Sequence, residues 1–269
     1  MRSLCSTLVL LLPSIALAFE GGDGSSGAPY EISDCAQLDS IRTTSNYATS
    51  DFLLVADVDC DGFDAFASFY TPYEGTFDGG GHAIRNLTIG AGTSTALFRE
   101  LGSTSVVRDL SILDVAGDIP ANSSSYVGVL AAHAKGHIED VVVTGALSVG
   151  RPGQIGGLVG YLQGGTMDRV HSAVDLTVVG AYGGYTVGGL VGLLNSSASV
   201  TLGSASGDVD YSGTGGTFVA LGGLFGRVVR SNCTECSATG DVTSADMTEP
   251  IAGGLVGRVQ SSLPTALFT

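Results

Sequence analysis

Basic residues are scarce in this sequence. Its 269 residues hold 11 lysines and arginines against 26 aspartates and glutamates, for a formal net charge of −15, and Lys135 is the only lysine. Nucleic acids and anionic lipid surfaces are bound mainly through positive charge. The composition therefore argues against both as partners, while the acidic surplus suits a protein that stays soluble at a cell surface.

Long apolar segments are missing as well. The apolar run Leu8–Leu12 is followed by Pro13 and by the small-residue site at 16–18. This run is too short to cross a bilayer, which takes about 20 apolar residues, and its surroundings are typical of a cleavable secretory signal. We therefore predict a signal peptide at 1–18, a mature secreted or cell-surface chain from Phe19, and no membrane span.

Tryptophan is absent and only seven residues are proline, whereas 41 are glycine and 44% are hydrophobic. So much Val, Leu and Ile is enough to build a core, which excludes a disordered chain. No stretch after residue 50 shows a sustained apolar stripe with a helical period, and glycine interrupts the chain too often for helices. Strands joined by tight turns are what the composition favours.

Four of the five cysteines lie beyond the expected cleavage site, in a chain expected to leave the reducing cytoplasm. Two pairs are the default count, and we expect Cys35 with Cys60 and Cys233 with Cys236. The second pair falls in columns that elsewhere hold Ile, Val or Met, which predicts burial. A local disulfide and two buried thiols both remain open for it.

An internal repeat of about thirty residues runs through the chain. Its units place a leucine at Leu97, Leu130, Leu158, Leu190, Leu224 and Leu255, in steps of 33, 28, 32, 34 and 31 residues. Units this short cannot enclose a core alone, but stacking aligns their inward columns and buries them continuously. The repeat predicts an all-β fold, a β-solenoid in which like apolar side chains form ladders along the axis.

Glycine pairs precede the last four of these leucines. They lie at 156/157, 188/189, 222/223 and 253/254, so that Gly157, Gly189, Gly223 and Gly254 directly precede their leucines. Glycine is required either where the backbone turns with a positive φ or where it runs too close to the next coil for a Cβ. Both explanations fit the sequence.

A second column follows each of these segments, with the pattern apolar-x-x-apolar-x-apolar. Its rows are Ile84/Leu87/Ile89, Val107/Leu110/Ile112, Ile138/Val141/Val143, Met167/Val170/Ser172, Val200/Gly203/Ala205 and Cys233/Cys236/Ala238. The last pair of each row is two residues apart, as in a strand with one buried face. We expect the charged residues between them to face solvent, namely Arg108, Asp109, Glu139, Asp140, Asp168, Arg169 and Glu235.

The segment before the repeats differs from them. Asp34 and Gln37 form a helix-capping pattern, Leu38 and Ile41 give one apolar face of a short helix, and a strand is expected over 52–55. We assign 19–75 as an N-terminal linker and capping segment that covers the open edge of the first coil. The repeats then occupy 76–269 and end in an incomplete unit at 263–269, so either the chain is a fragment or this end meets a partner.

Two motifs together resemble a known family. They are Phe77-Asp78-Gly79-Gly80-Gly81-His82-Ala83-Ile84-Arg85-Asn86-Leu87-Thr88-Ile89 and the units Val/Ile-Gly-Gly-Leu-Val/Phe-Gly at 155–160, 187–192, 221–226 and 251–257. The chain resembles the bacterial GLUG-repeat proteins from about residue 30 onward. The resemblance implies a right-handed parallel β-helix on an exported surface protein, such as an adhesin or a non-catalytic region of an IgA-specific metallopeptidase, without a universal catalytic residue. The units at 96–98 and 128–131 depart from the pattern, with Ala96 and Val129 in place of the second glycine.

Two places in the sequence are candidate metal sites. His133 and His137 are four residues apart, but Ala134 stands where a zinc protease needs its general-base glutamate. Asp57, Asp59 and Asp61 alternate before a glycine like the start of a calcium loop, whose twelfth position is here Ser68 instead of glutamate. We favour an acidic turn tied by a disulfide over calcium, and expect no other cofactor.

Two further histidines have structural interpretations. His82 lies in the signature turn of the family motif and is expected to make structural hydrogen bonds. His171 falls on an outward position beside Arg169, where solvation is the simplest interpretation.

Three functions remain in play. The first is a non-enzymatic adhesion or binding module for glycans or surface proteins, with sugar-stacking faces among Tyr126, Tyr161, Tyr182, Tyr185 and Tyr211. The second is a filament subunit that self-associates through its C-terminal coil. The third is a polysaccharide-active enzyme. A lyase would need a cationic clamp and a base, and a glycosidase would need two carboxylates that face each other. We expect the first.

Overall fold

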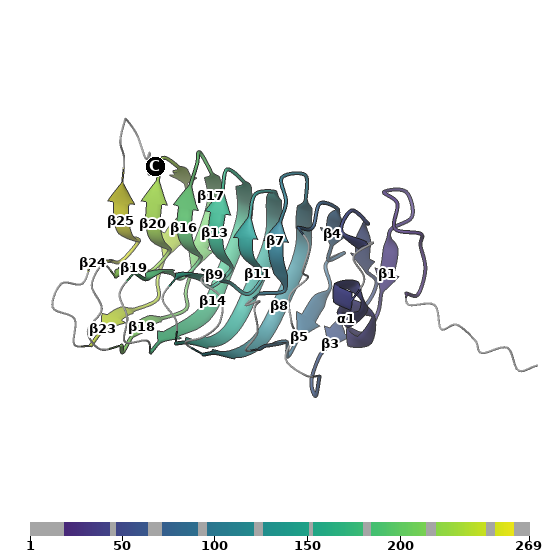
Figure 1. Ribbon diagram of the computed structural model, residues 1–269, viewed down its shortest axis with the longest axis horizontal. Coiled ribbons are helices and arrows are strands. Elements are labelled where there is room, and N and C mark those ends of the chain that lie inside the picture. The colour runs from purple at the N-terminus through teal and green to yellow at the C-terminus, as the bar shows by residue number, and fades with distance from the viewer. Residues whose placement is uncertain are drawn as a thin grey trace, which may run out of the picture.

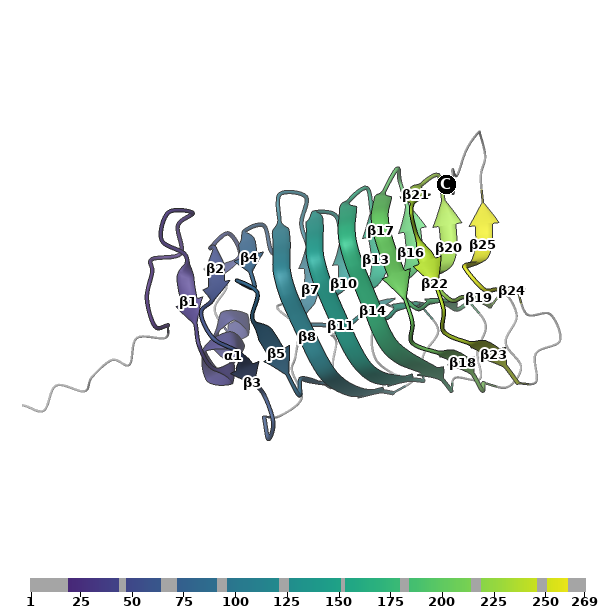
Figure 2. The same ribbon diagram turned by 180° about the vertical axis from the view of Figure 1, so that it is seen from behind.

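In its described residues, the protein is a stack of β-strand coils with one short helix at the N-terminal end (Figure 1). This computed structural model describes residues 19–43, 47–63, 72–90, 96–120, 126–150, 153–179, 184–213, 219–245 and 251–260. The predicted signal peptide and the residues of the incomplete last unit lie outside this part. The coils follow one another along the long axis, from the purple N-terminal end to the yellow C-terminal end, as the reverse view also shows (Figure 2).

The described residues form three sheets that line the stack. The largest has 14 strands: β1 (Tyr30–Ile32), β2 (Phe52–Leu54), β3 (Val58–Asp59), β4 (Thr76–Asp78), β5 (Ala83–Arg85), β6 (Thr88–Ile89), β8 (Val106–Ile119), β11 (His137–Val149), β14 (Thr166–Val178), β17 (Ser199–Ala205), β18 (Val209–Tyr211), β21 (Asn232–Thr234), β22 (Ser237–Ala238) and β23 (Val242–Ser244). The six-stranded sheet comprises β7 (Phe98–Leu101), β10 (Ala131–Ala134), β13 (Val159–Gln163), β16 (Val191–Asn195), β20 (Phe225–Val229) and β25 (Val256–Gln260). The five-stranded sheet comprises β9 (Tyr126–Val127), β12 (Gln154–Gly156), β15 (Thr186–Gly188), β19 (Ala220–Gly222) and β24 (Ile251–Gly253). Neighbouring strands of successive coils pair in parallel in all three sheets, which confirms the predicted parallel β-solenoid.

The repeated leucines form the expected ladder. The amide of Leu158 donates to the carbonyl of Leu190 at 3.0 Å, and that of Leu190 donates to Leu224 at 2.9 Å. The side chains of all three are fully buried, and the ladder continues from Leu224 to a partly buried Leu255. The steps that were counted in the sequence are therefore the lengths of the coils.

Close approach, and not a positive φ, explains the glycine pairs. None of their members is among the positive-φ glycines. A Cβ on Gly157 would lie 2.2 Å from the carbonyl oxygen of Gly189, and a Cβ on Gly189 would lie 2.2 Å from that of Gly223. Only glycine lets the backbones of successive coils stack this tightly.

The second column has the expected register in every row but the first. Ile138 pairs with Met167, and Met167 with Val200. The first row was wrongly aligned, because Phe77 pairs with Val107 and Ile84 pairs with Ile112. The turn at 79–81, with positive φ at Gly80 and Gly81, lengthens this coil between its inward residues Phe77 and Ile84. A count along the chain therefore assigns Ile84 to the wrong partner.

A column of left-handed residues turns charged side chains outward. Asp109, Asp140, Arg169, Leu202 and Glu235 have φ values of 51°, 51°, 50°, 52° and 53°. The left-handed conformation is unusual without glycine. Here it places two consecutive residues outward between inward neighbours, so that the predicted solvent-facing charges do lie on the outside.

The helix α1 (Cys35–Thr43) covers the N-terminal end. Asp34 Oδ1 accepts the amide of Gln37 at 2.8 Å, as the capping pattern predicted, while Gln37 Oε1 accepts the amide of Ser33 at 2.7 Å. Leu38 and Ile41 are buried against the first coils. Within the described ranges, no helix has both the length and the apolarity that a membrane crossing takes.

Candidate functional site

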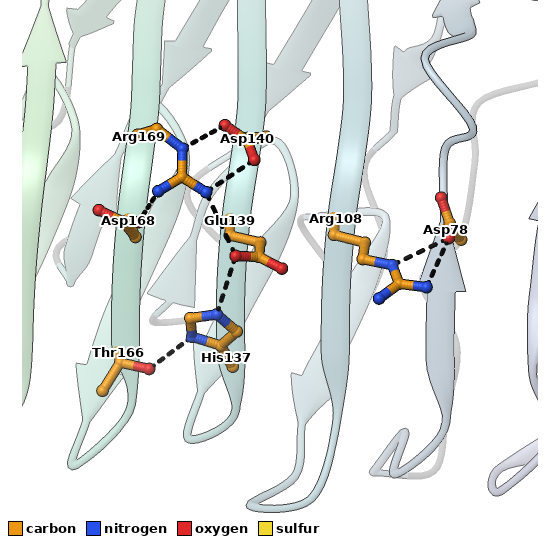
Figure 3. A network of polar contacts seen from close by, with 8 residues as sticks. All are labelled: Asp78, Arg108, His137, Glu139, Asp140, Thr166, Asp168 and Arg169. Carbon is orange, nitrogen blue, oxygen red and sulfur yellow. Dashed lines mark hydrogen bonds and ion pairs between the residues drawn. The ribbon is translucent and has the colours of Figure 1, made fainter.

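The outer surface of the 14-stranded sheet carries a row of polar side chains that runs across the coils (Figure 3). Parallel pairing brings one residue from each coil into this row, in the order Asp78, Arg108, Glu139, Asp168, Thr201 and Thr234. The left-handed column lies directly beside it. We call these two columns the polar face.

Arg169 is the centre of the largest group on this face. Its Nε donates to Asp140 Oδ1 at 2.6 Å, and its Nη2 donates to Asp140 Oδ2 at 2.8 Å and to Glu139 Oε2 at 3.3 Å. Nη1 also contacts Asp168. These hydrogen bonds lower the pKa of the Asp140 carboxyl group and raise the pKa of Arg169. One guanidinium therefore holds three carboxylates from two coils in fixed positions.

His137 extends this group toward the start of its strand. Its Nδ1 lies 2.7 Å from the hydroxyl of Thr166 in the next coil, and its Nε2 lies 3.5 Å from Glu139 Oε2. Figure 3 shows the chain of contacts from Thr166 through His137 and Glu139 to Arg169. His137 thus joins the polar face and does not pair with His133 as a metal-binding motif would require.

Asp78 and Arg108 form a second pair at the N-terminal end of the face. Arg108 Nε donates to Asp78 Oδ2 at 2.9 Å, and Asp78 Oδ1 accepts the amide of Gly80 at 2.8 Å. The two residues are 30 positions apart in the sequence, so no short motif could reveal them. The coil length was the available signal, because it places residues about thirty apart side by side.

Hydrogen bonds lower the pKa of several carboxyl groups on this chain, including Asp140 of the polar face. Every described carboxyl group with a resolved pKa shift has its pKa lowered, namely Asp23, Asp57, Asp59, Glu74 and Asp140. The general acid of a glycosidase needs a raised pKa to hold its proton at neutral pH. The lowered pKa of Asp140, which belongs to the polar face, therefore does not suit this residue to the role of general acid.

The tyrosines proposed for sugar stacking lie in different places. Tyr185 and Tyr211 are fully buried and pack against each other at 5.6 Å, so that part of the prediction was wrong. Tyr182 lies outside the described residues. Tyr126 and Tyr161 are close together at the surface, with ring centroids 5.7 Å apart.

Tyr161 stacks on His133 instead of offering a free ring face. The two rings are 4.8 Å apart and inclined by 5°, so each ring covers one face of the other. Leu193 follows Tyr161 in the register of the next coil. The imidazole Nε2 of His133 lies 3.0 Å from Gln163 Oε1, and the Tyr161 hydroxyl accepts from Asn195 at 3.3 Å.

We predict that His133 makes the fold sensitive to acid. Burial lowers the pKa of His133 below its usual 6.5, against the opposing charge of Glu100. The folded state then binds this proton less readily than the unfolded chain, so stability is complete above pH ~6.5 and decreases as pH falls through the folded pKa. Melting temperatures between pH 5 and 8 should decrease more in the wild type than in His133→Gln. Equal pH dependence of the two would contradict the assignment.

His171 contacts two serines of the next coil. Its Nδ1 lies 2.8 Å from Ser204 Oγ, and its Nε2 lies 3.3 Å from Ser206 Oγ. A nucleophile and a base at this distance call for a third group that orients the imidazole, usually a carboxylate. In the part of the chain that is described, no carboxylate forms an ion pair with His171, so we assign it no hydrolytic role.

Two of the three calcium candidates, Asp57 and Asp59, have carboxylates engaged in other contacts. Asp57 Oδ1 accepts the amide of Ala83 at 3.0 Å and faces His82 at 3.4 Å, and Asp59 Oδ1 accepts from Asn86 and from the amide of Asp61. No cluster of three or more metal-ligating side chains occurs among the residues that the structure describes. Asp57 and Asp59 fasten two coils to each other through these hydrogen bonds.

Both disulfides considered from the sequence are present. Cys35 in α1 is joined to Cys60, and Cys233 is joined to Cys236 within one turn of the large sheet. Cys233 is buried and Cys236 is partly buried. Of the two alternatives for the second pair, the structure has the local disulfide.

The chain is similar to part of halomucin. It is 31% identical to halomucin of Haloquadratum walsbyi (strain DSM 16790 / HBSQ001) over 156 residues, which cover 52% of this chain and 2% of halomucin. The chain thus spans a very small part of that protein. No family model matches, so the GLUG resemblance is not confirmed.

The architecture also has a solved counterpart. A candidate immunoglobulin A1 protease from Bacteroides ovatus superimposes with a TM-score of 0.74, covering 91% of this chain and 77% of that one. The two sequences are 21% identical. This similarity supports the solenoid fold alone.

Proposed function

We propose that this chain is an extracellular or cell-surface binding module that works without catalysis and attaches to glycans or surface proteins through its polar face. The observation that carries this proposal is the row of side chains from Asp78 to Thr234, which parallel register holds along the outer sheet. A rigid row with a spacing of about 4.8 Å per coil suits an extended partner. Contacts such as those of Arg169 reduce the entropy that binding would cost.

The extracellular setting has independent support. Two disulfides are typical of chains that mature outside the reducing cytoplasm. The signal-like N-terminus predicts the same route, and the similarity to halomucin fits a surface role.

The proposal is tested by retention of the full secreted chain on immobilised cellulose, chitin, xylan, pectin and mucin glycoprotein. We expect retention on at least one of them, without release of reducing or unsaturated ends or cleavage of the glycoprotein. Arg169→Glu, which places a fourth negative charge among three carboxylates, should weaken retention. The matched control is Arg99→Glu, the same charge change on β7 of the six-stranded sheet. Retention on none of these materials, or release of products, would contradict the proposal.

Self-association is the second candidate. Among the described residues, β23, β24 and β25 pair on one side only, and Ile251 and Val259 nearby are exposed. Unpaired strand edges are templates for another chain. Light scattering over a concentration series should show growth if this end stacks on a second copy, and a constant monomer mass would remove the idea.

A further inference from the structure

A small cavity opens at the N-terminal end of the polar face. Its volume is about 240 Å³. The residues that line it are Ser26, Pro29, Asp51, Phe52, Leu53, Thr76, Asp78, Val106 and Arg108. The sequence singled out none of them as a binding residue, because they come from four separate segments.

The floor of this cavity is formed by paired strands, and its wall is formed by a turn. The floor is the outer side of β2, β4 and β8, where Leu53 pairs with Asp78 and Asp78 pairs with Arg108. The wall is the turn that contains Ser26, closed by the bridge between Ser25 and Ala28. The amide of Asp51 donates to the carbonyl of Gly24 at 2.9 Å and so ties the wall to the floor.

Several polar atoms around the cavity remain available to a ligand. Asp51 Oδ1 accepts the amide of Thr76 at 2.7 Å, which leaves Oδ2 without a partner among the described residues. Arg108 uses Nε and Nη2 on Asp78, which leaves Nη1 without one in the same part of the chain. The cavity therefore offers a strong acceptor and a strong donor on a fixed frame, beside the hydroxyl of Thr76.

The lining of the cavity also contains apolar side chains. Leu53, Val106 and Pro29 supply aliphatic surface between the polar groups. A sugar ring has the matching surface, since its hydroxyls both donate and accept while its C–H groups are apolar.

Charge and size narrow the choice of sugar. Two carboxylates and one guanidinium give the lining a formal charge of about −1, which disfavours uronates, sialates and phosphates. The cavity is smaller than the ~300–1,000 Å³ of sites for drug-sized ligands, so it holds one ring rather than several.

We propose that this cavity binds one neutral pyranose unit of a glycan, with Asp51 accepting from and Arg108 donating to its hydroxyls. The inference rests on the proposed function and names a ligand class for one end of the polar face. The remaining units of the glycan would extend over the face toward Glu139 and Arg169.

Titration calorimetry on the full secreted chain tests this proposal. The probes are the methyl glycosides of glucose, galactose, mannose and N-acetylglucosamine, with methyl glucuronide and lysine amide as charged competitors. We expect saturable binding of at least one neutral glycoside, and weaker binding of both charged probes. Asp51→Asn and Arg108→Met should each weaken it at least about tenfold, because each removes a charged hydrogen-bonding group. The matched control Arg99→Met makes the same change on β7 of the six-stranded sheet, outside the cavity, and should bind as the wild type does.

The outcomes separate this inference from the proposed function. If the wild type is retained on a polymer but binds no neutral glycoside, the proposed sugar site in the cavity is wrong and the proposed binding function is supported. If glycosides bind but no polymer is retained, the proposed binding role of the polar face is wrong and the proposed sugar site in the cavity is supported. Tightest binding of the glucuronide or of lysine amide, or full affinity in both cavity variants, would overturn the neutral-sugar assignment. Thermal unfolding of each variant confirms that it is folded.

Discussion

Replacing Gly189 by alanine is expected to lower the free energy of unfolding by about 3 kcal/mol. The new methyl group would lie 2.2 Å from the carbonyl oxygen of Gly223, which belongs to the backbone of the next coil and cannot rotate away. The two coils must separate, which weakens the adjacent hydrogen bond from Leu190 to Leu224. Chemical denaturation followed by circular dichroism measures the loss.

Gly254 provides the control for this experiment. It occupies the same position in the ladder, but a Cβ there meets no described atom within 4 Å, and its φ is not positive. Gly254→Ala should therefore leave stability nearly unchanged. Equal losses in the two variants would show that glycine is retained for a reason other than the close approach of the coils.

Removal of the Cys35–Cys60 disulfide is expected to cost about 3 kcal/mol. The bond closes a loop of sequence separation 25, and a cross-link stabilises mainly by restricting the unfolded chain. The matched change is removal of Cys233–Cys236, whose separation is 3 and whose expected cost is about 1.5 kcal/mol. Double alanine variants, compared by denaturant unfolding, should show this order.

The first disulfide also has a positional effect. Cys35 begins α1, the helix that covers the N-terminal end of the stack. Losing it should let the cap open before the coils unfold, since repeat proteins lose their ends independently. Hydrogen exchange should then become faster in α1 than in β11. Equal stability of the two double variants, with no change in α1, would contradict both expectations.

Thiol counting on the unreduced, denatured wild type should detect no free thiol among the four cysteines.

Much of the fold could be predicted from the sequence because a solenoid is periodic. Its long-range contacts join residues one coil apart, so the steps between Leu97 and Leu255 are themselves the register of the six-stranded sheet. The helix was predictable for a local reason, since Asp34 accepts the amide of Gln37 in its first turn and Gln37 accepts the amide of Ser33 just before it. The first row of the second column failed because the turn after Asp78 adds residues that a count along the chain cannot assign.

Much less of the candidate site could be predicted from the sequence. Tyr185 and Tyr211 were taken as surface residues, although each is two positions from an inward valine, Val187 and Val209, and a period of two places them on the buried face. The polar face could be anticipated only as outward charges. Which carboxylates Arg169 would hold depended on the left-handed backbone at Asp140 and Arg169, which no sequence rule assigns to these residues.

The sequence by itself determined the all-β character of this chain, its coil length and its leucine and glycine ladders, because these follow from composition and from a period written along the chain. Only the tertiary structure decided that close contact between coils explains the glycines, that Arg169 holds three carboxylates from two coils, and that Asp51, Asp78 and Arg108 surround one cavity. Those facts depend on distances between segments that lie far apart in the sequence, and no local pattern encodes such distances.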